Sequence, residues 1–349
     1  MHIVTSRHLR FMLIGLAATC VITPHPTYAD VDLGRGNEGA STRQEGSTNG
    51  HTLQSRITFS GSTRGNTEAS PKTVTPVDNW IPPACWYEPM TAEEFAASME
   101  KAYDSVVNDP RQPGYAKAGQ GQYREIYKDG KYKNYNLDEK NRGSWWVAAQ
   151  DHSRLNESGA WACDELPFWV ERGGTPLMKN TATPRILAEL AYNRIQLPDT
   201  VVSLAPAHAT KVNLPTWVWL DTAKFKEVSV TATLNAGGIN IQAITTARPI
   251  SLKLEPGTLD AKTFPPSGEC VEDADGSIGE RYSRGNANDT PPCGIEYFRS
   301  SIDGNFRLRA VLTWKITWKG TGDAGGNLPN GTFGKDQDIA VEEIQAINR

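Results

Sequence analysis

Histidine is scarce in this sequence, which narrows the chemistry available to the protein. The chain holds 6 histidines, and after residue 80 only His152 and His208 remain. A Ser–His–Asp or Cys–His site needs a histidine with a nucleophile and an orienting acid. The best candidate is therefore Asp151, His152 and Ser153, although no Gly-x-Ser-x-Gly elbow accompanies them. A solvated polar loop is the alternative interpretation of the same residues.

The sequence also lacks any Cys-x-x-Cys pair, which argues against a zinc site. Four cysteines remain beyond residue 29, and an even number in an exported protein indicates two disulfides. Three pairings are possible. We predict the two local ones, in which each bond lies within one domain: Cys85–Cys163 and Cys270–Cys293.

No other residue pattern indicates a metal or a cofactor. The segment 273–280 carries Asp273, Asp275 and Glu280, but it lacks the third acid and the spacing of a calcium loop. The stretch GRGNEG (34–39) matches the dinucleotide motif without the strand and helix that the motif requires. We expect no metal site and no cofactor.

A basic surface and a long apolar run are missing as well. The net charge is −4 and the pI is about 5.9, so nucleic acid is not an expected partner. The apolar run 11–22 is too short to cross a bilayer and is typical of a signal peptide over 1–29, ending in small residues. We expect a secreted, extracellular or cell-envelope protein without a further transmembrane segment. A lipoprotein anchored through Cys20 is the alternative.

Composition divides the remaining chain into three parts. Residues 30–79 contain scarcely an apolar side chain, which predicts a disordered tether. Residues 80–205 predict a small α+β domain, with a helix after the capping box Thr91–Glu94 and another after Thr183. Between these helices we expect a hairpin that turns at Asp129–Gly130 and a strand near 145–149.

Residues 210–349 are dominated by strand patterns. From Phe306 to Trp318 every second residue is apolar, which predicts a strand with one face on a core. The segments 228–234, 239–243, 250–254 and 338–344 predict further strands. Together they favour an antiparallel sandwich. In it, the paired tryptophans are expected to fill the core: Trp217, Trp219, Trp314 and Trp318.

Several segments of this half carry a family resemblance. In order they read LPTWVWLD, VSVTATL, SLKLEPG, CGIEYFRSS, LTWKITWKG and VEEIQAIN. The set resembles a group of uncharacterised secreted proteins of actinobacteria, whose C-terminal half looks like a PKD/immunoglobulin-type β-sandwich. Where that group carries Trp-x-x-Gly-Asp-Gly, this chain has Leu252 to Gly257. The resemblance implies an Ig/PKD-like fold and no particular activity.

One segment suggests a contact surface for an envelope glycan or protein, because tyrosines alternate with lysines in it. The candidate residues are Tyr123, Tyr127, Tyr132 and Tyr135. The alternative is that these side chains face a core.

Our first hypothesis is a non-catalytic binding or structural module. The competing hypothesis is a secreted hydrolase or carbohydrate-binding protein with its site in 80–205. A tryptophan-lined cleft there would favour sugar binding: Trp145, Trp146, Trp161 and Trp169.

Overall fold

The computed structural model describes residues 55–61, 74–174, 176–207, 209–286, 288–301 and 304–343. The signal peptide predicted over 1–29, with Cys20, lies outside this part of the chain, as does His208. The α-helices are α1 (Ala92–Val107), α2 (Gly114–Lys128) and α3 (Pro184–Tyr192). The 3-10 turns are η1 (Asn134–Glu139), η2 (His152–Arg154), η3 (Ser158–Trp161), η4 (Arg284–Asn286) and η5 (Thr321–Asp323).

The strands follow the chain from one end of the molecule to the other. They are β1 (Ile57–Gly61), β2 (Thr75–Pro76), β3 (Cys85–Met90), β4 (Gly143–Gln150), β5 (Phe168–Glu171), β6 (Ser203–Ala205), β7 (Ala209–Lys211), β8 (Thr216–Trp219), β9 (Val228–Ala236), β10 (Ile239–Glu255), β11 (Ala261–Phe264), β12 (Glu269–Val271), β13 (Gly294–Tyr297), β14 (Phe306–Gly320) and β15 (Ala324–Glu342). The described chain is thus mainly β, as predicted.

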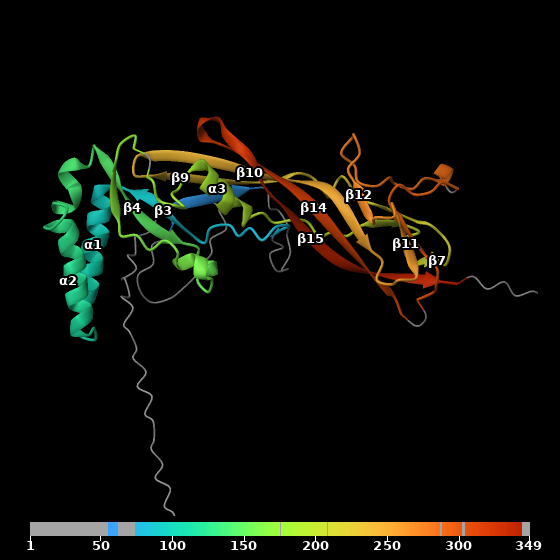
Figure 1. Cartoon of the computed structure of the whole chain (residues 1–349), viewed down its shortest axis with the longest axis horizontal. Helices are drawn as coiled ribbons and strands as arrows, with labels where there is room; N and C mark the ends of the chain where they lie inside the picture. The colour runs from blue at the N-terminus through green and yellow to red at the C-terminus, as the bar shows by residue number, and fades with distance from the viewer. Residues whose placement is uncertain are drawn as a thin grey trace, which may run out of the picture.

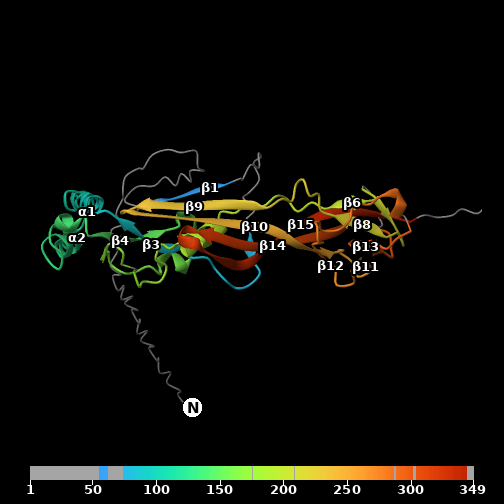
Figure 2. The ribbon, with the colours of Figure 1, turned by 90° about the horizontal axis from the view of Figure 1, so that it is seen from above.

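The molecule is elongated, with helices α1 and α2 at one end and the small sheet β3-β4-β5 beside them (Figure 1). The largest sheet has the order β1-β9-β10-β14-β15-β2, with β12 joined to β10 and β7 to β15. Its longest strands are β10, β14 and β15. Strand β10 starts beside β3 and β4, and β14 and β15 extend from the middle of the molecule to the other end, where the sheet β11-β13-β8-β6 lies (Figure 2). Neighbouring strands are antiparallel except β7, which is parallel to β15.

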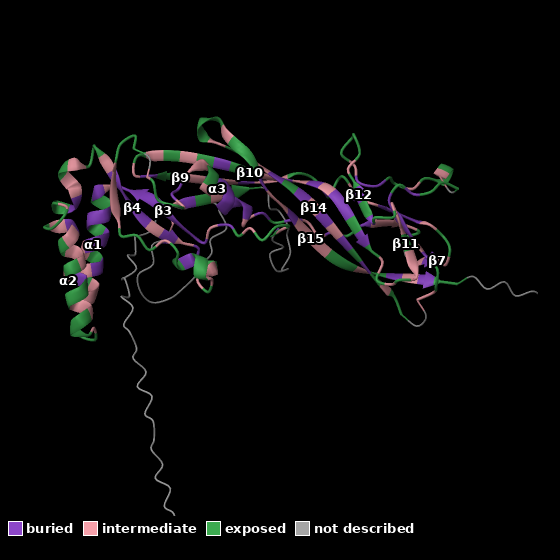
Figure 3. Cartoon of the chain, in the orientation of Figure 1, coloured by how far each residue is buried: buried purple, intermediate pink, exposed green. Residues whose placement is uncertain are grey.

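Strand β14 shows the predicted alternation of burial. Leu308, Ala310, Leu312, Trp314, Ile316 and Trp318 are buried, whereas Arg307, Arg309 and Lys315 are exposed. Buried bands along the long strands mark this pattern in Figure 3. The prediction that Trp314 and Trp318 belong to the core is confirmed. Trp217 is buried as well, and Trp219 is half-buried.

Two sheets share the core at the end opposite the helices. Tyr297 of β13 stacks on Phe306 of β14 with ring centroids 5.2 Å apart. Cys270 of β12 and Cys293, next to β13, form a disulfide that ties one sheet to the other. The other disulfide joins Cys85 and Cys163, so the predicted pairing is confirmed. Antiparallel sheets are present as expected.

Prolines coincide with irregular pairing in both neighbours of β14. Pro249 of β10 lies opposite Trp314, and the register shifts directly after it. In β15 the register shifts between Gly331 and Leu328, a stretch that contains Pro329. A proline has no N–H to donate to the ladder, so it favours a bulge at these positions. The predicted strand 250–254 is therefore the second half of the bulged strand β10.

Part of the predicted tether belongs to the main sheet. Residues 57–61 form β1 at one edge, paired with β9, and β2 pairs with β15 at the other edge. Ile57 and Val74 are buried and Phe59 packs against the same core, and the low apolar content of the segment gave no sign of these contacts. The prediction of disorder is thus wrong for these residues.

Helix α3, assigned above to the small domain, covers the main sheet. Its predicted cap is confirmed, because Thr183 Oγ1 accepts from the amide of Ile186 at 3.2 Å. Its apolar side, including Leu187 and Leu190, is buried in the same core as β9, β10 and β14. Thr245 of β10 donates to the carbonyl of Ala188 at 2.9 Å. The proposed boundary near 205 therefore does not separate two cores.

Helix α1 begins as predicted, with both hydrogen bonds of the Thr91–Glu94 capping box. The predicted hairpin turning at Asp129–Gly130 is wrong, since residues 114–128 form helix α2 and Asp129 ends it. The tyrosines of this segment are spaced for a helical face, with Tyr123 and Tyr127 four residues apart. The prediction of a hairpin, in which tyrosines alternate with lysines, did not take this helical spacing into account.

Candidate functional site

Asp151, His152 and Ser153 form the start of the 3-10 turn η2. Ser153 donates its amide and its hydroxyl to Asp151 Oδ1, at 3.1 and 2.6 Å. Asp151 therefore caps the turn and holds the serine directly. His152 is exposed, and within the described residues its ring makes no hydrogen bond to either neighbour. A triad places the histidine between the nucleophile and the acid, and these three residues do not have that order.

The loop around this turn is held by structural contacts. Asp151 is buried, and Arg194 approaches its Oδ1 within 3.7 Å. Arg154 makes two hydrogen bonds to Glu157, at 2.9 and 2.6 Å, and also donates to the carbonyl of Pro82 at 3.0 Å. With the Cys85–Cys163 disulfide nearby, these contacts fix the loop to the start of β3.

The four candidate tyrosines pack into one aromatic cluster under α1 and α2. Tyr127 and Tyr135 are buried, and Tyr123 and Tyr132 are partly buried against the same cluster. At its centre Phe95 stacks on Trp145 with centroids 4.3 Å apart. The core alternative considered for these tyrosines thus describes their position.

Glu100 of α1 joins both helices to the turn η1. It accepts from Arg124 at 2.8 and 3.0 Å, from Lys128 at 2.8 Å and from Tyr135 Oη at 2.6 Å. Burial raises the pKa of Glu100, but these donors outweigh it and lower the pKa to about 2. The carboxylate is therefore a fixed anionic link between α1, α2 and η1.

Tyr135 adopts a left-handed backbone conformation to reach Glu100. Asn134, Tyr135 and Asn136 all have positive φ, at 44°, 56° and 58°. Each such residue costs about 1–2 kcal/mol outside glycine. The Tyr135 carbonyl accepts from Trp145 Nε1 at 2.8 Å. The left-handed conformation therefore brings both the carbonyl and the hydroxyl of Tyr135 to hydrogen-bond partners. The strained turn holds the helical end of the molecule, formed by α1, α2 and η1, in one geometry.

Helix α2 and the segment after it carry an excess of basic side chains, whereas helix α1 has four acidic residues and one basic residue. Between Arg111 and Lys133 the sequence has six basic and two acidic residues, although the whole chain has a net charge of −4. Glu100 and Asp109 pair with three of the six. Lys131 and Lys133 are exposed, Lys117 is half-buried and Tyr115 is 79% exposed.

The four tryptophans considered for a sugar-binding cleft do not share a surface. Trp145 and Trp146 are buried on opposite sides of β4, in separate cores. Trp169 is half-buried beside Trp145, and Trp161 is 63% exposed on η3. Successive residues of a strand point to opposite faces, which separates Trp145 from Trp146.

A buried carboxylate that the sequence did not reveal lies on β3, where the residues just before β1 contact this strand. Glu88 accepts from the Arg56 amide, Ser55 Oγ and Trp86 Nε1, each at 3.0 Å. Burial raises the pKa of Glu88 against the opposing effect of these donors. Alternation along β3 could not reveal it, because this strand is buried on both faces.

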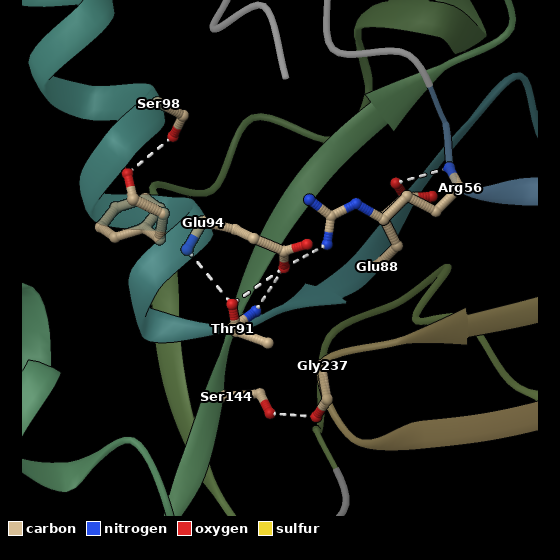
Figure 4. A network of polar contacts seen from close by, with 8 residues as sticks. Arg56, Glu88, Thr91, Glu94, Ser98, Ser144 and Gly237 are labelled. Carbon is tan, nitrogen blue, oxygen red and sulfur yellow. Dashed lines mark hydrogen bonds and ion pairs between the residues drawn. The ribbon is translucent and has the colours of Figure 1, made fainter. Parts of the chain in front are cut away.

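The same region joins the helical end to the main sheet, as Figure 4 shows. Arg56 extends its guanidinium to Glu94, 2.8 Å away, in the capping box of α1. Ser144 of β4 donates to the carbonyl of Gly237 at 2.5 Å, at the turn between β9 and β10. We call Glu88, Arg56, Glu94, Ser144 and Gly237 the junction.

The described residues contain no group of three or more His, Cys, Asp or Glu side chains placed to hold a metal ion. None of the described helices is both long and apolar enough to pass through a membrane. No protein-family model matches the chain, and neither does any curated protein or solved structure.

Proposed function

We propose that this chain is a secreted or cell-envelope module that binds or spaces other components and performs no catalysis. The observation that carries the proposal is the continuity of the long strands. Strand β10, of 17 residues, starts beside β3 and β4, and strands β14 and β15, of 15 and 19 residues, extend the same sheet to the opposite end. The ladder resumes on both sides of the bulges at Pro249 and Pro329, so one sheet still links the two ends, which suits a spacer.

The helical end is the proposed contact surface. The Glu100 network and the aromatic cluster hold α1 and α2 rigid, so little ordering entropy is lost on binding. The basic side chains Lys117, Lys131 and Lys133, with Tyr115, suit an anionic envelope polymer such as an acidic glycan. The Ig/PKD-like assignment and the family resemblance are part of this proposal, supported by the shared core of two antiparallel sheets.

Retention on isolated cell-envelope material tests the proposal with the full mature chain. We expect low-salt retention that a triple change of Lys117, Lys131 and Lys133 to Glu abolishes. The matched control changes Lys253, Arg281 and Arg284 to Glu, three exposed basic residues outside the helical end. Equal loss in both variants would place the contact elsewhere, and no retention of the wild type would overturn the binding proposal.

A further inference from the structure

Tyr192 of α3 and Trp314 of the main sheet both lie next to Gly331 of β15. Thr245, which bonds to α3, lies opposite Trp318 in the ladder, so Trp318 faces α3. Trp314 lies four residues earlier on the same strand and therefore faces the same side. Tyr192 is the last residue of α3.

Gly331 of β15 brings the Tyr192 hydroxyl to Trp314. Gly331 lies directly opposite Trp314 in the ladder. A Cβ atom at position 331 would be 2.7 Å from Tyr192 Oη and 1.7 Å from Val74 Cγ1. Only glycine leaves room for the phenol there, so Tyr192 Oη reaches the backbone position that faces the indole.

Both polar atoms are buried without a protein partner in the part of the chain that the structure describes. Tyr192 is 1% exposed and Trp314 is 0% exposed. Neither Tyr192 Oη nor Trp314 Nε1 has a hydrogen-bond partner among the described residues. An unsatisfied buried donor destabilises the folded state, so two of them on either side of Gly331 call for an explanation.

The backbone around these atoms is also irregular. The bulge of β10 begins at Pro249, opposite Trp314, and the bulge of β15 adjoins Gly331. A bulge opens the ladder locally and bends the strand, and bulges are frequent beside binding sites. The orphaned donors thus lie where two strands depart from regular pairing.

We propose that this position binds one internal water molecule, which accepts hydrogen bonds from Tyr192 Oη and Trp314 Nε1. Two donors meet the minimum that a buried water needs. A neutral ligand fits better than an anion, because both donors are uncharged. Burial raises the pKa of Tyr192, which means that this site disfavours negative charge.

Proton NMR of the mature protein gives a direct test. We expect a cross-peak between the Trp314 indole N–H and a slowly exchanging water, and its loss in Tyr192→Phe. Trp145 is the matched control, since its indole N–H donates to the Tyr135 carbonyl and is expected to show no such peak. A protected Trp314 N–H without a water cross-peak would overturn the proposal.

A double-mutant cycle provides the second test. Tyr192→Phe is expected to lower the folded-to-unfolded ratio about tenfold in the wild type and far less in Trp314→Phe, because the water is then already destabilised. A neutral or stabilising effect of Tyr192→Phe in both backgrounds would show that the hydroxyl is simply unsatisfied. The NMR result on the wild type decides the matter if Trp314→Phe does not fold.

Discussion

Two single carboxylates, the buried Glu88 and the half-buried Glu100, hold parts of this molecule together. Glu88 accepts three hydrogen bonds, two from the residues just before β1 and one from β3, and Glu100 accepts four from α2 and η1. The two carboxyls differ in the effect that dominates their pKa. Burial prevails at Glu88, whereas at Glu100 two cations and a phenol prevail over burial. Their pH dependences should therefore be opposite.

Glu88→Gln should cost less stability as the pH rises. The pKa of Glu88 in the folded protein lies above its ordinary value of 4.5. Its contribution is therefore complete below pH 4.5 and is lost as the pH rises through the folded pKa. Urea unfolding of both proteins across this range measures the difference in free energy. A difference that grows with pH would contradict the prediction.

Glu100→Gln should show the reverse. The folded pKa is about 2 against an ordinary value of 4.5, so the contribution is present above pH 4.5 and is lost as the pH falls toward 2. The side chain is 34% exposed, and after allowance for solvent screening we expect a loss of about 1 kcal/mol at neutral pH. Glu125→Gln, on the exposed side of α2, is the control. Equal losses in the two variants would count against the network.

At the scale of elements, turns position one sheet against another. The β9–β10 turn consists of Gly237 and Gly238, with φ of 57° and 77°. Gly237 also contacts β3: a Cβ there would be 2.9 Å from Pro89 Cβ and 3.0 Å from the Met90 nitrogen. Gly238 has open space around the corresponding position. Comparing the two glycines therefore distinguishes the effect of backbone conformation from the effect of packing.

Alanine at each glycine gives a matched comparison. Both variants should lose about 1–2 kcal/mol because alanine disfavours positive φ. Gly237→Ala should lose a further 1–3 kcal/mol, roughly, since it pushes the turn away from β3. Thermal and urea unfolding measure both. Indistinguishable losses would mean that the turn can shift without disturbing the junction.

For the whole molecule, the disulfides act at different ranges. Cys85–Cys163 closes a separation of 78 residues and Cys270–Cys293 one of 23. A longer loop loses more entropy in the unfolded chain when it is closed. Replacing the first pair by alanine should therefore cost about 4.5 kcal/mol and the second about 3.5 kcal/mol. Chemical denaturation of the two double variants checks the order, and a larger loss for the shorter loop would refute it.

Local signals were sufficient for several features. The Thr91–Glu94 box and the Thr183–Pro184 start predicted two helices, because capping depends on residues within one turn. The alternation of β14 predicted which face is buried. Each of these rests on neighbours in sequence, so the sequence by itself determined them.

Features that depend on distant segments were decided only by the tertiary structure. β1 became a strand because β9 offered it an edge, and α3 joined the main sheet because its apolar face had to be covered. Glu88 acquired two of its three donors across more than 30 residues, and Tyr192 and Trp314 both came to lie next to Gly331 of a later strand. Burial and polar pairing are properties of the folded surroundings, and no window of the sequence contains them.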